Sequence, residues 1–266
     1  MKYDLLIVGG GPAGLTAAIH ARARGKSALV ISNEPTASPL CKAHKMANYP
    51  GLPDVTGLEL VERLAAQAEG LGAEFKTGRA LSVMPMGKSV MVSVENDAVE
   101  GRAVILAPGV SRAAPLKGEM ELLGRGVSYC ATCDGMFYRG RDVVCAGDAP
   151  NFAEEVEFLR SIGCRAAEVR LPGLSILGEE RVTGVRTAAG EEIPCEGVFL
   201  LRSSIAPAQL APGLELEGGY IKVDGRMATS LPSVFAAGDC TGQPLQLAKA
   251  VGQGQTAAHF AIEEMG

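Results

Sequence analysis

Two cysteines separated by two residues, Cys130 and Cys133, have the spacing in this chain that most clearly points to chemistry. Such spacing allows the two sulfurs to close into a disulfide, and the pKa of a thiol in this motif is often lowered, which makes it nucleophilic. A zinc site would need a second Cys or His pair, and His20, His44 and His259 are not suitably spaced. The motif therefore predicts a redox-active dithiol without a metal; the alternative is a pair of buried free thiols.

Asp134 follows the second cysteine directly. A carboxylate in this position is a candidate to accept or donate the proton that thiol exchange requires. The chain has seven cysteines in 266 residues, an odd number and too few for a disulfide-stapled secreted domain. With no signal-peptide pattern and no apolar run near the roughly 20 residues of a membrane span, the sequence predicts a cytoplasmic protein.

A second chemical pattern lies near the N-terminus, where Gly9, Gly11 and Gly14 form GxGxxG between a short apolar run and a predicted helix. These glycines allow a tight turn, close approach of a pyrophosphate and close packing of helix on strand. The helix N-terminus adds N–H donors and a positive dipole end. Glu34, about 20 residues further on, is placed to bind a ribose. The pattern predicts a dinucleotide site; the alternative is a structural glycine-rich turn.

The last predicted strand, residues 234–237, ends at Gly238 and Asp239. In a doubly wound sheet, ligands lie just outside the carboxyl ends of the strands. A carboxylate there can accept hydrogen bonds from polyol hydroxyls, and the following helix can point N–H groups at an electron-rich ring, which suits a flavin. The alternative is an aspartate that caps a helix.

The elements that must position these residues follow an α/β pattern. A strand, a helix and a strand within residues 3–32 form a βαβ unit, and a second strand–helix pair occupies residues 142–163. Helices are also predicted over residues 56–71 and 246–264, and short strands lie between residues 73 and 107. The length corresponds to about two domains. A net charge of −5 lacks the basic character of a nucleic-acid-binding protein.

Taken together, these patterns resemble the low-molecular-weight thioredoxin reductases over nearly the whole chain. The matching blocks are Gly9-Gly-Gly-Pro-Ala-Gly14, Asn48-Tyr-Pro-Gly51 with Thr56-Gly57, Gly124-Arg-Gly-Val-Ser-Tyr-Cys-Ala-Thr-Cys-Asp-Gly135, and Ala228-Thr-Ser with Val234-Phe-Ala-Ala-Gly-Asp239. The resemblance implies two Rossmann-like (three-layer ββα) domains. Residues 1–113 and 219–266 would form the FAD-binding domain, and residues 114–218 a reduced middle domain that rotates between flavin and partner.

The resemblance also assigns roles to individual residues. Cys133 would be the sulfur next to the flavin, Cys130 the thiol that attacks the partner, and Asp134 the acid/base. Asn48 would lie near the flavin ring. The residues that would hold FAD are Gly9, Gly11, Pro12, Ala13, Gly14, Gly238 and Asp239, with Gln246 and Leu247 at the start of the helix that faces the flavin pyrimidine.

The middle domain departs from the NADPH-using members of that family. Their second GxGxxA loop is represented here by Cys145-Ala-Gly-Asp-Ala-Pro150, in which only Gly147 remains and the continuation is longer and bulkier. The arginine cluster for the 2′-phosphate is reduced to one Arg within residues 167–172. Leu245 stands where NADPH-dependent members usually carry Arg. The pattern resembles relatives that do not use NADPH, of which the best known take electrons from ferredoxin and others carry a second FAD.

We therefore expect an FAD enzyme that reduces thioredoxin or a thioredoxin-like protein, with ferredoxin as the electron donor and a homodimeric assembly by family resemblance. Two alternatives stay open on the sequence. One is an NADPH-dependent reductase with an unusual nucleotide loop. The other is a non-enzymatic flavin redox sensor whose dithiol switches its conformation.

Overall fold

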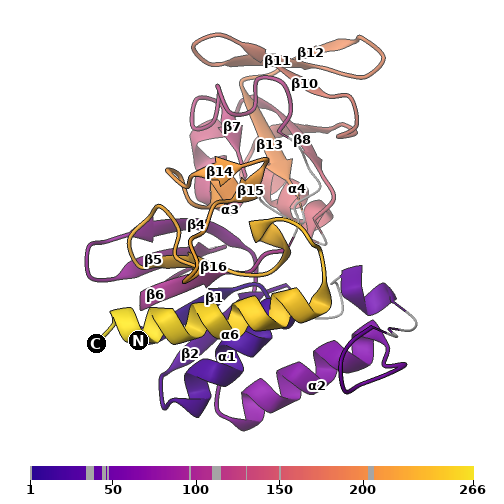
Figure 1. Ribbon diagram of the computed structural model, residues 1–266. Coiled ribbons are helices and arrows are strands. Elements are labelled where there is room, and N and C mark those ends of the chain that lie inside the picture. Colours follow the sequence, from indigo (N-terminus) through magenta and orange to yellow (C-terminus); the bar gives the residue numbers. More distant parts are fainter. Residues whose placement is uncertain are drawn as a thin grey trace. The chain divides into compact units, whose positions relative to one another are not determined.

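The computed structural model describes residues 2–33, 39–43, 46, 48–95, 97–109, 115–129, 131–149, 151–202 and 207–266. The chain divides into two compact units (Figure 1). The first unit comprises residues 1–111 and 207–266, and the second comprises residues 112–206. Residues 207–218, which the sequence analysis assigns to the middle domain, thus lie in the first unit.

The first unit is built on a seven-stranded sheet with the order β3-β2-β1-β6-β5-β4, in which β16 also pairs with β6. Strands β1, β2, β3, β6 and β16 run parallel, and β4 and β5 join as an antiparallel extension. The parallel strands β2 and β16 are short apolar runs because both of their faces are buried, whereas the edge strand β3 is largely exposed. Their bounds are β1 Lys2–Val8, β2 Ala28–Ser32, β3 Glu74–Thr77, β4 Ala80–Pro85, β5 Val90–Val94, β6 Asp97–Leu106 and β16 Val234–Ala236.

Helices α1 (Pro12–Ala23) and α6 (Leu247–Glu264) pack side by side against this sheet (Figure 1). Their contact is lined by alanines, and a Cβ at Gly254 of α6 would lie only 2.1 Å from the carbonyl oxygen of Ala13 in α1. This close approach fixes α6 beside the loop that begins α1. Helix α2 (Gly57–Gly70) starts with the predicted cap, in which Thr56 Oγ1 accepts a hydrogen bond from the Glu59 N–H at 3.1 Å.

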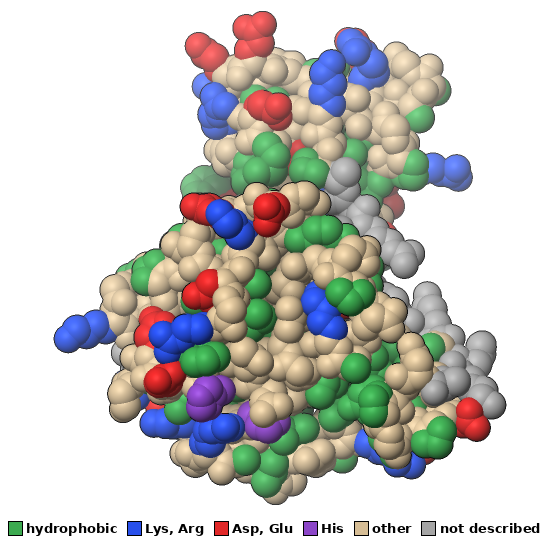
Figure 2. All heavy atoms as spheres, in the orientation of Figure 1, with side chains coloured by type: hydrophobic (Ala, Val, Ile, Leu, Met, Phe, Trp, Pro, Cys, Tyr) green, Lys and Arg blue, Asp and Glu red, His purple; other side chains and the backbone are tan. Residues whose placement is uncertain are grey.

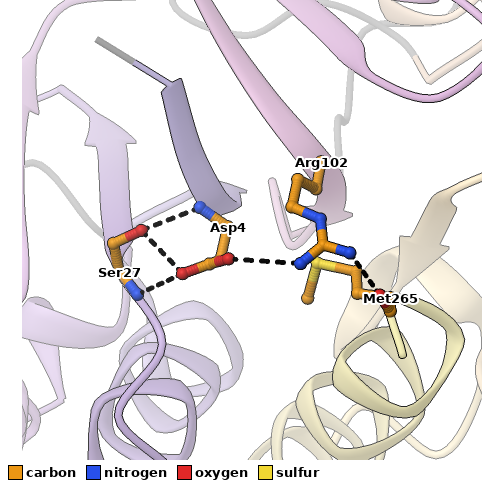
Figure 3. Close-up of polar contacts among 4 residues, drawn as sticks. All are labelled: Asp4, Ser27, Arg102 and Met265. Carbon is orange, nitrogen blue, oxygen red and sulfur yellow. Dashed lines mark hydrogen bonds and ion pairs between the residues drawn. The ribbon is translucent and has the colours of Figure 1, made fainter.

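Polar contacts anchor the far end of α6 to the sheet (Figure 3). Asp4 of β1 accepts hydrogen bonds from the backbone N–H and the hydroxyl of Ser27, both at 2.9 Å. The guanidinium of Arg102 in β6 lies 3.6 Å from the other Asp4 oxygen and donates to the carbonyl of Met265. One carboxylate thus connects two strands with the C-terminal end of the helix.

The second unit contains a four-stranded parallel sheet, β7-β13-β8-β9, and an antiparallel sheet, β10-β11-β12. Helix α4 (Phe152–Ser161) follows β8, as predicted. Asn151 is the N-cap residue of this helix, and its side chain makes no capping hydrogen bond. The strands are β7 Val127–Ser128, β8 Asp142–Gly147, β9 Arg165–Glu168, β10 Ser175–Gly178, β11 Val182–Arg186, β12 Glu192–Pro194 and β13 Gly197–Leu201.

Short elements complete both units. They are η2 Pro39–Lys42, α3 Ala131–Asp134, η3 Gly135–Tyr138, α5 Pro207–Leu210, β14 Leu216–Glu217, β15 Tyr220–Ile221 and η4 Asp239–Thr241. Within the described residues, no helix is long and apolar enough to cross a membrane. On the face drawn in Figure 2, acidic and basic side chains are interspersed. The α/β class with Rossmann-like architecture is confirmed.

Candidate functional site

The loop between β1 and α1 has the geometry of a phosphate-binding turn. Gly9 has a φ of 117°, and a Cβ there would lie 2.1 Å from the Ala107 carbonyl oxygen. A Cβ at Gly14 would lie 1.9 Å from the Gly9 carbonyl oxygen, so α1 packs directly on the loop. Around Gly11, by contrast, no atom lies within 4 Å of the Cβ position. The loop is closed toward the protein and open at Gly11, where a pyrophosphate would approach.

The loop after β16 lies next to the first one. The Cβ position of Gly238 is 2.9 Å from the Cβ of Ala13, which is the second residue of α1. Asp239 starts η4 in this loop. Burial raises the pKa of its carboxyl group, and the positive charge of Lys249 acts in the opposite direction. The fold thus brings together the GxGxxG loop and the Gly238–Asp239 pair that the sequence predicts for one ligand.

Two further predicted flavin neighbours also meet. The amide Nδ2 of Asn48 donates to Oε1 of Gln246 at 3.1 Å, although the two residues are 198 positions apart. Gln246 is the N-cap of α6, and Leu247 packs against the apolar cluster around Met46 and Leu60. Glu34, the predicted ribose ligand, lies outside the described residues.

These features test whether the first unit fits FAD. An open glycine turn at a helix N-terminus suits the pyrophosphate, and a carboxylate one loop away suits the ribityl hydroxyls. The N-cap of α6 makes no side-chain capping hydrogen bond, so the backbone N–H groups of its first turn have no side-chain acceptor at that position. The residues present therefore fit FAD.

The dithiol motif belongs to the second unit. Cys130 lies outside the described residues, as does the side chain of Cys133, whose backbone belongs to α3. Asp134 ends that helix and lies 2.7 Å from the hydroxyl of the buried Ser128. Within the described residues, no cluster of three or more His, Cys, Asp or Glu side chains could hold a metal.

Two buried carboxylates that sequence reasoning missed contact residues on either side of Cys130 in the sequence. Glu155 of α4 accepts a hydrogen bond from the N–H of Ala131 at 3.3 Å. Glu119 is fully buried and forms a bidentate ion pair with Arg202 at 2.9 and 3.0 Å. The hydroxyl of Tyr129, next to Cys130, also donates to Glu119 at 3.1 Å. The sequence feature that could have indicated this buried ion pair is the charged Arg202, which directly follows the apolar strand β13.

The loop after β8 differs from its counterpart after β1. The N–H groups of Asp148 and Ala149 both donate to the carbonyl oxygen of Leu201, at 3.1 and 3.0 Å. A Cβ at Gly147 would lie 1.8 Å from the same oxygen. In the sequence, Pro150 stands at the position that Gly14 holds in the first loop, and Phe152 is the first residue of α4. The N–H groups of Asp148 and Ala149 point into the loop's own sheet, and the glycine that allows close helix packing is replaced.

The remaining described cysteines are free thiols: Cys41, Cys145, Cys164, Cys195 and Cys240. Burial raises the pKa of Cys145 and of Cys240 to about 12, and it also raises the pKa of Cys41. These three thiols are protonated at neutral pH and are poor nucleophiles.

The fold and the site define a class of protein: a Rossmann-like α/β flavoprotein with a CxxC dithiol. Comparison with known proteins agrees. The model of the pyridine nucleotide-disulphide oxidoreductase family matches residues 3–169 and 169–254. A thioredoxin reductase from Listeria innocua is 32% identical over 302 aligned positions, and the alignment covers 99% of this chain and 95% of the relative.

Solved structures of thioredoxin reductases are also similar to this chain. A ferredoxin-flavin thioredoxin reductase from Clostridium acetobutylicum is 36% identical, with a TM-score of 0.89 over 100% of this chain and 98% of that one. An atypical thioredoxin reductase from Desulfovibrio vulgaris Hildenborough is 31% identical, with a TM-score of 0.75 over 99% and 98%. The chain belongs to the pyridine nucleotide-disulphide oxidoreductase family and is an oxidoreductase of the thioredoxin reductase type.

Proposed function

We propose that this protein reduces the disulfide of thioredoxin or a thioredoxin-like protein, with electrons that come from reduced ferredoxin rather than from NADPH. FAD would be held in the first unit by the Gly9–Gly14 loop, Asp239 and the Asn48–Gln246 pair, and it would supply the two electrons that reduce the Cys130–Cys133 disulfide to the dithiol. The listeria relative supports thioredoxin as the substrate class, and the clostridial relative, by its name, supports ferredoxin as the donor.

The chemistry of the dithiol follows from thiol–disulfide exchange. In the reduced protein the Cys130 thiolate attacks one sulfur of the partner disulfide, and the other sulfur leaves as a thiol after it takes a proton. Cys133 then attacks the mixed disulfide, which releases the reduced partner and leaves the Cys130–Cys133 disulfide. Asp134 would exchange the protons of these steps, held in place by its contact with Ser128.

The loop after β8 is the observation that carries the choice of donor. A dinucleotide pyrophosphate needs backbone N–H groups that point outward at the start of a helix. Here the N–H groups of Asp148 and Ala149 are bonded to Leu201 instead. Within the same chain, the open turn at Gly11 has the geometry that this loop lacks. A loop so arranged offers NADPH little to bind, which favours a protein electron donor.

An anaerobic titration of the flavin absorbance tests this proposal. We expect bleaching by enzymatically reduced ferredoxin and none by NADPH or NADH at micromolar concentrations. Rapid bleaching by NADPH would instead support an ordinary reductase with an unusual loop. The redox-sensor alternative predicts negligible turnover of any disulfide substrate by the intact protein, whereas a reductase turns over thioredoxin and loses this activity in Cys133→Ser while it keeps FAD.

A further inference from the structure

Lys249, in the first turn of α6, makes contacts that its position on a helix surface would not predict. Its ammonium group donates to the carbonyl oxygens of Gly238 and Gly242, at 3.2 and 2.5 Å, and to the hydroxyl of Thr241 at 3.3 Å. A lysine ammonium has three donors, so this network engages all of them. A single side chain therefore closes both ends of the five-residue loop that carries Asp239.

Gln253, one turn further along α6, also contacts that loop. Its Oε1 accepts from the N–H of Gly238 at 2.9 Å and lies 2.9 Å from the hydroxyl of Thr241. Lys249 thus binds the acceptors of the loop and Gln253 binds its donors. Both glycines of the loop have positive φ, 86° at Gly238 and 108° at Gly242, a conformation that glycine adopts readily. The two side chains of α6 therefore hold a turn that its glycines permit.

The charge of Lys249 has a second consequence. Asp239 is partly buried, and among the described residues Lys249 is the charged side chain whose field acts on it. The adjacent Cys240 thiol is protonated because its pKa is about 12, and Tyr220 of β15 packs at Gly242. A cation beside a carboxylate favours its charged form, and a charged carboxylate accepts stronger hydrogen bonds from hydroxyl groups.

We propose that Lys249 is a positioning residue of the FAD site, which shapes the Asp239 loop and keeps the Asp239 carboxylate charged for the ribityl hydroxyls. This inference rests on the proposed FAD site. It goes beyond the family resemblance, which assigns Asp239 but no role to a lysine in the first turn of α6.

The experiment measures FAD affinity of the apoprotein by flavin fluorescence between pH 5 and pH 8, in wild type, Lys249→Met and Gln253→Met. In Lys249→Met we expect FAD affinity to fall about tenfold at every pH, because the loop loses the hydrogen bonds of the ammonium group. We also expect the pH below which affinity falls further to move upward, because Asp239 takes up a proton at a higher pH. Gln253→Met loosens the loop but keeps the cation, so it should weaken binding equally at all pH values.

Controls separate this role from general effects. Lys88→Met removes an exposed lysine in the turn between β4 and β5 of the same unit, and it reports the loss of one positive charge outside the loop. In Lys249→Met with Asp239→Asn, no upward pH shift should remain. If Lys249→Met folds poorly, Lys249→Arg keeps the charge and should keep the wild-type pH midpoint.

The inference is overturned if the pH at which FAD affinity falls is the same in Lys249→Met as in wild type. It is also overturned if this pH shifts as much in Lys249→Arg as in Lys249→Met. Wild-type protein that binds no FAD would instead reject the proposed FAD site. The two failures are therefore distinguishable.

Discussion

Gly14 is the residue at which a single methyl group should matter most for the cofactor site. Its Cβ position lies 1.9 Å from the carbonyl oxygen of Gly9 and 3.1 Å from Ile7. Because both the oxygen and the helix backbone are fixed by packing, the methyl group of alanine can fit only if α1 moves away from the loop. That movement would carry the helix N-terminus away from the pyrophosphate.

Gly14→Ala should therefore lower FAD affinity by at least about tenfold, since the loop and helix no longer meet. FAD content after purification and fluorescence titration of the apoprotein measure this change. Gly252→Ala is the matched control, because Gly252 is a helical glycine of α6 with no atom within 4 Å of its Cβ position. Equal FAD affinity in the two variants would contradict the assignment of the loop.

At this scale the sequence predicted residues whose roles depend on local spacing. The three glycines of the first loop and Asp239 were found because each follows a short apolar strand. The ion pair of Glu119 with Arg202 was not found, since it joins positions 83 residues apart. Lys249 was also missed, because a lysine in a helical pattern ordinarily indicates only a solvated surface.

Elements are held together in the first unit by long-range contacts that no local pattern reveals. Asp4 is such a contact: it joins β1, β2 and, through Arg102, the end of α6 (Figure 3). Burial raises the pKa of this carboxyl group. The hydrogen bonds from Ser27 and the charges of Lys26 and Arg102 outweigh burial, so the pKa lies below its ordinary value.

Asp4→Asn should destabilise the protein by about 1 kcal/mol at pH 7, because the hydrogen bonds and the ion pair lose their charged acceptor. A carboxylate with a lowered folded-state pKa stabilises the fold above its ordinary pKa of about 4, and this contribution is lost as the pH falls through the folded-state pKa. Urea unfolding at pH 7 and at pH 3 should therefore show that the difference in free energy of unfolding between wild type and variant is smaller at pH 3.

Glu69→Gln, at an exposed position on α2, serves as the control for loss of one negative charge. If the loss of unfolding free energy in Asp4→Asn is the same at pH 7 and pH 3, or is equal to the loss in Glu69→Gln, the Asp4 charge does not anchor these elements.

Over the whole molecule, the sequence predicted the class of fold and the strand–helix pairs β1–α1 and β8–α4, because strand, turn and helix follow one another locally. It could not predict that the loop after β8 bonds its amides to Leu201, since that contact depends on a strand more than 50 residues away. The loss of the glycine pattern over residues 145–150 was visible in the sequence, but the direction of the amide groups was not. The electron donor is inferred from that direction.

Under the proposed function, electrons leave for the partner protein through the dithiol motif, and exposed residues that follow this motif in the sequence are candidates to contact the partner. Phe137 and Met136, directly after the Cys130–Gly135 segment, are 75% and 56% exposed. Exposed aromatic and methionine side chains are enriched in protein interfaces, and a large apolar side chain is costly to leave in water without a function. We expect Phe137 to contact the partner protein while Cys130 attacks its disulfide.

The Cys133→Ser background isolates this step, because it leaves Cys130 as the motif thiol and stops the reaction at the mixed disulfide. In that background Phe137→Ala should slow mixed-disulfide formation with oxidised thioredoxin about tenfold, the effect of one interface anchor. The rate with a small aromatic disulfide should not change, since that reagent needs no protein contact. Met120→Ala, at a second exposed methionine of the same unit (43% exposed), should leave both rates unaltered. If Phe137→Ala slows both disulfides by the same factor, the side chain acts on the reactivity of Cys130 and not on recognition of the partner.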